Sequence, residues 1–243
     1  MAASGYKEYY IQLFNVRTRA PIDDDTGVCA VLTDGSPAYA TCYADDRGTA
    51  LTNPVTFTNG AIRFFVADTA TSLDLSILTA SGYSVFAESI TESVHRIDVN
   101  PELMTQKLVI PYVFNATVTG AVTDTGFDLS ASMLVKDIEV DVFTVATGGV
   151  LTVGTSTTTT GFCTGVAASV TGFPVTLLEE SLVSTSSVWG TFLAVGTGMY
   201  VRKKHVRANA TSGANIVYQN TTSSSTAGNG YIYLTYDRLP SRG

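Results

Sequence analysis

The sequence has 243 residues, 45% of them hydrophobic and only 14% charged, which suits one large or two smaller domains with a substantial core. Charged residues are fewer than in an ordinary soluble domain, and threonine is abundant instead, at 36 residues. Thr, Val and Tyr favour sheets over helices. The net charge of −7 argues against nucleic acid as a partner, because an acidic surface repels phosphate backbones.

The first ten residues are polar and carry three tyrosines, Tyr6, Tyr9 and Tyr10. A secretory signal would need an apolar segment at this place, so synthesis in the cytoplasm is expected. No run reaches the roughly 18 apolar residues of a membrane helix, so no membrane partner is expected. We interpret residues 1–10 as an N-terminal arm that becomes ordered when the protein binds its partner.

Strands are predicted where apolar and polar residues alternate with a period of two, as in residues 62–66 and 73–77. The residues expected to face the core in these two runs are Ile62, Phe64, Val66, Leu73, Leu75 and Ile77. The pair Asn59-Gly60 predicts a hairpin turn before the first run, because both residues tolerate positive φ. No long amphipathic helix is predicted; residues 90–95 and 101–106 could each form one helical turn.

A domain boundary is predicted between about residues 111 and 124, where the acidity of the chain falls. The prediction is an N-terminal domain over residues 1–114, including the arm, and a C-terminal domain over residues 115–243. In the second domain, residues 137–142 alternate charged with branched side chains, and a strand with one wet face belongs to an antiparallel sheet. The predicted fold class is therefore all-β, with two antiparallel β-sandwich domains of immunoglobulin-like or jelly-roll-like type.

No catalytic constellation stands out. The two histidines, His95 and His205, belong to no hydrolase or zinc motif, and each is interpreted as a surface or hydrogen-bonded structural residue. A glycosidase would need two carboxylates across a cleft. The candidates are Asp23, Asp24, Asp25, Asp45, Asp46, Glu179 and Glu180. No enzyme activity, catalytic residue, cofactor or metal is expected.

The acidic residues at 23–25 and at 45–46 are better explained as parts of turns than as catalytic groups. Residues 23–25 are interpreted as a solvated turn, with Ca²⁺ binding as the less favoured alternative, because the distal Glu of a calcium loop is missing. Residues 45–48 are interpreted as a turn in which Asp side chains bond to their own backbone.

Three cysteines, Cys29, Cys42 and Cys163, form no CxxC pair and are expected to be free, buried thiols. Cys29 and Cys42 could approach each other across neighbouring strands, but no pattern requires a disulfide. One basic cluster covers residues 202–207. A solvated strand face or a subunit contact is its favoured interpretation, and binding of phosphate or of an acidic partner is the alternative.

Residues 40–60 carry the most specific pattern: Tyr43, Asp45, Gly48, Leu51 and Asn53-Pro54, followed by the Asn-Gly pair. The stretch resembles a small β-sandwich module of tailed-bacteriophage virion proteins, with the pattern Y-x-D-x-x-G-T-x-L-x-N-P-V and then an aromatic strand. The resemblance covers residues 40–77. Residues 124–138 are similar to capsid-surface proteins of tailed phages of marine type.

This resemblance implies a virion protein. The leading hypothesis is a capsid decoration, or cement, protein that binds the major capsid protein as a homotrimer on the outside of the head. The alternative is a tail, collar or fibre-base protein that binds a receptor or glycan through aromatics such as Trp189 and Tyr200, although core packing is the favoured role of Trp189. Copy number per particle separates the two, because decoration needs hundreds of copies.

Overall fold

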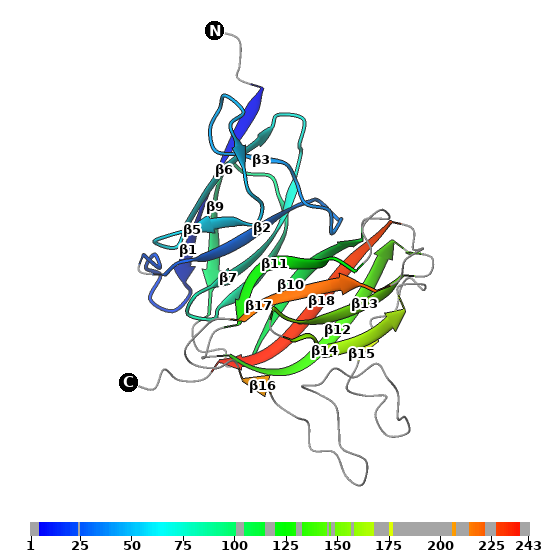
Figure 1. Ribbon diagram of the computed structural model, residues 1–243. Coiled ribbons are helices and arrows are strands. Elements are labelled where there is room, and N and C mark those ends of the chain that lie inside the picture. The colour runs from blue at the N-terminus through cyan, green and yellow to red at the C-terminus, as the bar shows by residue number, and fades with distance from the viewer. Residues whose placement is uncertain are drawn as a thin grey trace. The chain divides into compact units, whose positions relative to one another are not determined.

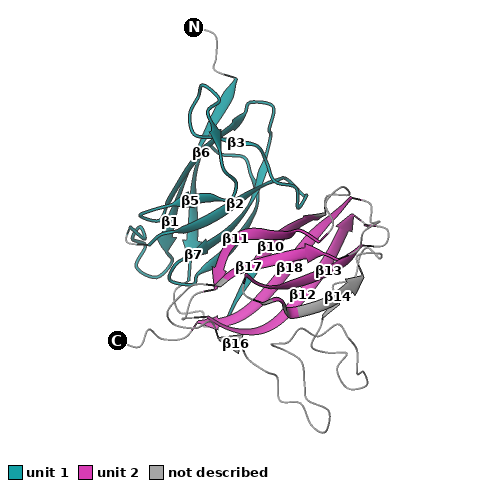
Figure 2. Ribbon diagram, in the orientation of Figure 1, with its two compact units in different colours: residues 1–108 teal, residues 109–243 magenta. Residues whose placement is uncertain are grey.

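The computed structural model shows two compact units, Met1–Leu108 and Val109–Gly243, coloured separately in Figure 2. The structure describes residues 5–23, 25–100, 105–114, 120–129, 133–144, 146, 149–156, 158–167, 175–176, 206–207, 214–221 and 227–238. These residues form strands and turns and contain no helix, so the predicted all-β class is confirmed. None of them forms a helix that could span a membrane.

The described residues of unit 1 form nine strands before β10 (Thr105–Phe114) begins (Figure 1). They are β1 (Tyr6–Asn15), β2 (Gly27–Thr33), β3 (Cys42–Tyr43), β4 (Ala50–Leu51), β5 (Val55–Phe57), β6 (Ala61–Ala67), β7 (Leu73–Thr79), β8 (Ser84–Ile90) and β9 (Val94–Val99). One sheet has the order β4-β3-β6-β1-β9 and the other the order β5-β2-β7-β8. Neither stretch that could have formed a helical turn is helical where it is described: residues 90–95 are the end of β8, a three-residue connection and the start of β9, and residues 105–106 belong to a strand.

The two sheets of unit 1 share one hydrophobic core, because side chains from both belong to the same buried cluster. Tyr9 of β1 stacks on Phe64 of β6, with ring centroids 5.4 Å apart. The predicted inward residues of β6 and β7 are all buried. The tight turn at Asn59-Gly60 is confirmed, since these residues have φ of 57° and 60°. It is not the turn of a paired hairpin, because β5 and β6 lie in different sheets and the turn leads from one sheet to the other.

The N-terminal arm predicted over residues 1–10 is corrected for the part that the structure describes. Tyr6–Asn15 is β1, which lies inside its sheet between β6 and β9. Its register with β6 runs from Tyr6 opposite Ala67 to Gln12 opposite Ala61. The segment is a strand without any partner molecule because Tyr9, Ile11 and Leu13 alternate into the core.

One strand pair of unit 1 departs from antiparallel pairing. β1 and β9 are parallel, with Tyr10 opposite Val94 and Asn15 opposite Val99. The chain reaches β9 from β8, which lies in the other sheet, so it enters by a crossover between sheets and not by a hairpin.

The remaining strands belong to unit 2, apart from the first residues of β10. They are β10 (Thr105–Phe114), β11 (Val122–Leu129), β12 (Met133–Thr144), β13 (Val150–Thr155), β14 (Thr158–Ala167), β15 (Val175–Thr176), β16 (Val206–Arg207), β17 (Ala214–Asn220) and β18 (Gly228–Arg238). One sheet has the order β10-β18-β12-β15, with β16 also paired to β12; the other has the order β11-β17-β13-β14.

Tyr218 of β17 connects the two sheets of unit 2. Its hydroxyl donates to the carbonyl oxygen of Val113 in β10 and accepts a bond from the Val113 amide, both at 3.1 Å. Its ring lies 6.1 Å from that of Tyr112. In β12 the alternation is as predicted: Ile138, Val140 and Val142 are buried, and the carboxylates between them are not.

The division after Leu108 lies before the domain boundary predicted after residue 114. The reason is β10, which the apolar run from Leu108 to Tyr112 makes a sheet strand rather than a linker. This strand pairs with β18, the last strand of unit 2.

Candidate interaction surface

The Asp45 side chain organises the turn between β3 and β4. Its Oδ1 accepts bonds from the backbone amides of Arg47 and Thr49, both at 3.0 Å, and its Oδ2 accepts the Thr49 hydroxyl at 2.7 Å. These bonds, above all that from the Thr49 amide, hold the pKa of Asp45 below its ordinary value. The carboxylate is therefore used by its own turn, as predicted for residues 45–48.

Asn53 ties three backbone groups together. Its Oδ1 accepts the Val31 amide at 3.0 Å, and its Nδ2 donates to the carbonyl oxygens of Val31 and Ala40 at 2.7 and 2.9 Å. Val31 lies in β2 and Ala40 lies just before β3, which is in the other sheet. Asn53 therefore fixes the segment in which the chain passes from the sheet of β2 to the sheet of β3.

The ring of Tyr6 packs against Gly48 and Tyr43. Gly48 has φ of +84°, and a Cβ added to it would lie 2.5 Å from the Tyr6 hydroxyl. The rings of Tyr6 and Tyr43 meet edge to face with centroids 4.6 Å apart. The contacts of Tyr43, Asp45, Gly48 and Asn53 thus support the fold of unit 1.

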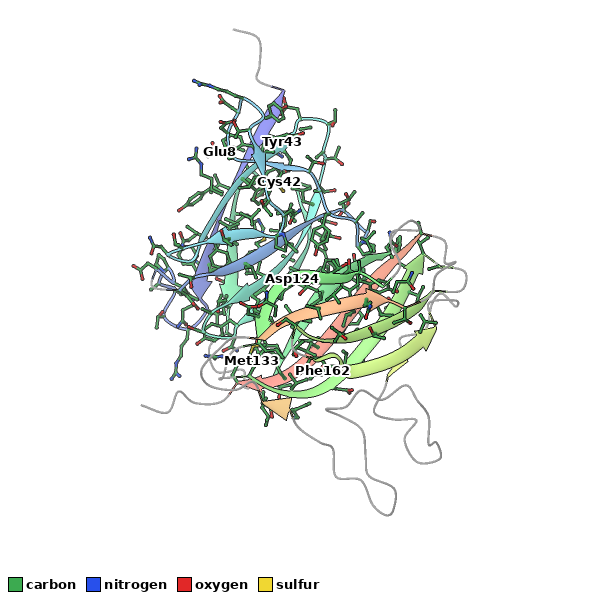
Figure 3. All side chains as sticks on the ribbon, in the orientation of Figure 1. Glu8, Cys42, Tyr43, Asp124, Met133 and Phe162 are labelled. Atoms are coloured by element: carbon green, nitrogen blue, oxygen red, sulfur yellow. The ribbon has the colours of Figure 1, made fainter. Side chains whose placement is uncertain are left out.

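The outward side of the β3-β6-β1-β9 part of this sheet carries an unusual number of aromatic side chains. We call it the aromatic face of unit 1; Figure 3 labels two of its residues, Glu8 and Tyr43. On β1 its members alternate with the buried Tyr9, Ile11 and Leu13. The aromatic face consists of Tyr6, Glu8, Tyr10, Gln12, Phe14, Tyr43, Arg63, Phe65, Val94, Arg96 and Asp98.

The charges of the aromatic face are paired. Arg63 Nε lies 2.6 Å from Glu8 Oε1, and Arg96 Nε lies 2.7 Å from Asp98 Oδ1. Each guanidinium also lies over a ring of the same face, Arg63 at 5.5 Å from the centroid of Phe65 and Arg96 at 4.2 Å from that of Phe14. These four charges cancel, although the chain as a whole carries −7.

Two large apolar side chains are left open on the aromatic face. Tyr10 is 38% exposed and Val94 is 71% exposed, and the two are opposite each other in the β1–β9 register. Scattered exposed apolar residues are ordinary, but neighbouring ones on a sheet face whose charges are paired mark a surface suited to contact with another molecule.

Of the carboxylates proposed from the sequence, Asp25 and Asp45 are described and bond to different backbone segments. Asp25 is buried at 4% exposure, which corrects the solvated position predicted for it, whereas Asp23 is exposed as predicted. Its carbonyl accepts the Gly60 amide at 2.8 Å, and its Oδ1 accepts the Ser81 amide at 3.2 Å. Asp45 lies in the turn described above. Among the described residues, no three His, Cys, Asp or Glu side chains are grouped as metal ligands would be.

His95 is partly exposed, and its Nδ1 lies 4.0 Å from Glu92. Cys29 and Cys42 are free and buried, as predicted, and burial raises the pKa of both thiols, that of Cys42 to about 12. Several candidates lie outside what the structure describes. They are Asp24, the Cys163 side chain, Glu179, Glu180, Trp189, Tyr200, His205 and the basic residues 202–204.

Sequence reasoning missed the aromatic face because it treated residues 1–10 as an arm. The signal was present in the period-two order of Tyr6, Glu8, Tyr10, Gln12 and Phe14. Their neighbours on β6 and β9 come from more than 45 positions further along the chain, for example Glu8 with Arg63 and Tyr10 with Val94, so the face as a whole depends on strand pairing.

No protein-family model matches the sequence, and no curated protein matches it. Among solved structures, the chain is similar to part of a cyanophage Pam1 capsid asymmetric unit, at 16% identity and a TM-score of 0.33, over 56% of this chain and 85% of that one. It is also similar to the major pilin SpaA of Corynebacterium diphtheriae, at 8% identity and a TM-score of 0.24, over 96% of this chain and 59% of the pilin. Both likenesses are weak and concern the fold rather than an activity.

Proposed function

We propose that the protein is a structural component of a tailed-phage virion that binds the outside of the assembled capsid and stabilises it. The observation that carries the proposal is the aromatic face of unit 1, a β surface with paired charges and exposed apolar side chains at Tyr10 and Val94. The resemblance of residues 40–60 to a phage virion module supports the same proposal. It implies a mechanical role and no catalysis.

The aromatic face suits a protein partner with an apolar contact surface, and we propose that this partner is the major capsid protein. Burying Tyr10 and Val94 against apolar groups would contribute roughly 1.5–3 kcal/mol for each side chain. Arg63 and Arg96 are already paired, so covering them leaves no charge without its partner. Binding only to the assembled lattice stabilises it by mass action, because local opening of the shell would also have to release the bound protein.

We further propose that the protein acts as a homotrimer. Three copies joined about one axis would engage three lattice sites together, and such multivalent contact strengthens binding that is weak at each site. Sedimentation of the purified chain tests this directly, with a trimer as the expected species. A monomer at micromolar concentration would remove this part of the proposal and leave capsid binding untouched.

Particles provide the main test. Purified virions should contain hundreds of copies of the chain, cryo-microscopy should place it outside the head, and stripping it should lower the temperature at which capsids release DNA. A count of a few to dozens would instead indicate a tail, collar or fibre-base protein. Unchanged heat resistance after complete stripping would rule out cementing.

Surface variants then test the face. Tyr10→Ala combined with Val94→Ala should weaken rebinding to stripped particles by at least about tenfold, since roughly 1.4 kcal/mol suffices for that factor. The matched control is Val122→Ala with Phe143→Ala in unit 2, where the residues are 47% and 51% exposed. Equal binding by both double variants would show that the aromatic face is not the contact.

A further inference from the structure

Cys29 and Cys42 belong to the same hydrophobic core cluster but to different sheets of unit 1. Cys29 lies in β2, opposite Val55 of β5. Cys42 lies in β3, opposite Leu51 of β4. The chain therefore passes from one sheet to the other twice near these residues, once before Cys42 and once between Leu51 and Val55.

These passages bring the sheets close at one place. Tyr39 pairs with Leu32, and the Ala40 amide donates to the Val31 carbonyl at 2.9 Å, so residues 39–40 run beside β2. Cys42 is in the other sheet only two residues later, and two residues span at most about 7 Å. The ordinary spacing of packed sheets is about 10 Å.

The two cysteines face each other across the core and not along a sheet. Both edges of β2 at Cys29 are occupied, by Val55 of β5 and Ile77 of β7, whereas Cys42 belongs to the other sheet, which contributes to the same buried cluster. Both side chains point into the core, since each is buried in the shared cluster. The Asn53 amide bonds to both Val31 and Ala40 and fixes the two segments at this point. Proximity also shows in their titration, because Cys42 contributes to the raised pKa of Cys29 after the larger effect of burial.

We propose that Cys29 and Cys42 are an oxidisable pair whose disulfide joins the two sheets of unit 1 across its core. The two S–H bonds break, one S–S bond forms, and the thiols release two protons and two electrons. A low-molecular-weight disulfide such as oxidised glutathione accepts them and is cleaved into two thiols. The pair would be reduced in a reducing cytoplasm and oxidised outside the cell.

Oxidation should be slow in the native chain. Buried, protonated thiols are poor nucleophiles, so the reaction waits for a local opening. β3 is the segment best placed to open, because it is two residues long and only one of its residues is paired with β6. The rate of disulfide formation should therefore rise in mild denaturant. The fraction oxidised at equilibrium in native buffer should be the same whether the chain is oxidised while folded or during refolding.

Peptide mapping of the full chain tests the proposal. The reduced protein is equilibrated in glutathione buffer, both as the folded chain and by refolding from urea, then unfolded, alkylated and cleaved with trypsin. Trypsin produces residues 20–47 as one peptide with both Cys29 and Cys42, and residues 137–202 as another with Cys163. The expected result is a 20–47 peptide that has lost two hydrogen atoms and takes no label, beside a labelled 137–202 peptide.

Stability provides the second readout. The oxidised chain should melt several degrees above the reduced chain, because a cross-link restricts the unfolded state. Cys163→Ser should keep this gain and Cys42→Ala should lose it. Full alkylation of both thiols in the 20–47 peptide after refolding in oxidising buffer would refute the proposal, as would a cross-link to Cys163. The mapping decides the matter even if Cys42→Ala fails to fold, and neither result depends on capsid binding.

Discussion

At the scale of single residues, polar side chains of unit 1 are fixed by the backbone they contact. Asn53 shows this most clearly, since one amide group serves β2 and the segment before β3. The sequence pattern indicated a bend at Asn53-Pro54, but not these bonds. Their acceptors and donor lie 13 and 22 positions earlier, and no local rule links such distant residues.

Replacing Asn53 should be costly. In Asn53→Ala the Val31 amide loses its bond to the side chain, and the Ala40 carbonyl keeps only the weak donor Cys42 Sγ at 3.7 Å among its side-chain partners. Leaving such a group poorly satisfied costs about 1–3 kcal/mol. We expect the free energy of unfolding to fall by about 2–4 kcal/mol in urea titrations. The adjacent Thr52→Ala, at an exposed position, is the control and should change it by less than about 0.5 kcal/mol. Equal effects of both changes would contradict the bridging role of Asn53.

The Asp45 carboxylate makes the free energy of unfolding depend on pH in the acid range. Its pKa in the folded chain lies below its ordinary value, mainly because the Thr49 amide bonds to the ionised form. A lowered folded pKa means that the carboxylate stabilises the fold above the unfolded pKa of about 4, and that this contribution is lost as the pH falls through the folded value. Asp34, held by the hydroxyls of Ser72 and Ser89, acts in the same direction.

The measurement is the free energy of unfolding between about pH 6 and about pH 2.5. Asp45→Asn should give a flatter decline than the natural chain, since an amide oxygen can still accept the Arg47 and Thr49 amides but cannot be protonated in this range. Asp46→Asn, in the same turn but outside this bonding, should leave the slope as it is. Parallel curves for the natural chain and Asp45→Asn would count against this account.

At the scale of strands, alternation predicted the inward residues of β6, β7 and β12 because each strand has a regular dry face. It did not predict that β7 is buried along its whole length. Asp74 of this strand looks like a solvent position in the sequence, but it is buried, with its carboxylate accepting the amides of Gly35 and Ser89. Only the folded arrangement of three chain segments supplies these donors.

β1 provides a direct contrast between strand and arm. Tyr9 is fully buried against Phe64, whereas its neighbour Tyr10 is 38% exposed. Tyr9→Ala should lower the free energy of unfolding by about 3–5 kcal/mol, the usual cost of removing a large buried ring. Tyr10→Ala should lower it by less than about 1 kcal/mol. A flexible arm would make both changes harmless to stability, so thermal unfolding of the two variants decides between the descriptions.

The tight turn between β5 and β6 depends on Gly60. A Cβ added there would lie 1.8 Å from the Ile22 carbonyl oxygen, at a φ of +60°. Left-handed strain of about 1–2 kcal/mol and overpacking of about 1–3 kcal/mol should together make Gly60→Ala cost about 2–5 kcal/mol. Gly35→Ala has a similar φ of +65° with nothing within 4 Å, and should show the strain alone. Unfolding curves of the two variants measure the difference, and equal costs would contradict the close contact.

At the scale of the whole molecule, the charges of the aromatic face are balanced, whereas the remainder of the chain is acidic. The chain carries −7, while the two arginines of the aromatic face are matched by Glu8 and Asp98. Net charge could be read from the sequence, but its local cancellation could not, because the Glu8–Arg63 pair joins residues 55 positions apart. Binding through this face should therefore come mainly from apolar burial rather than from attraction between net charges.

Salt separates these two kinds of binding. Raising the ionic strength from about 0.1 M to about 1 M shortens the screening length from about 10 Å to about 3 Å, which weakens attraction between exposed charges but leaves apolar contact intact. If the aromatic face binds the capsid, the amount of this chain that sediments with particles should stay constant over that range. If the acidic remainder of the surface binds a basic partner, the chain should dissociate while the capsids remain intact. The Tyr10→Ala, Val94→Ala variant sharpens the contrast, because its weakened binding should also be insensitive to salt.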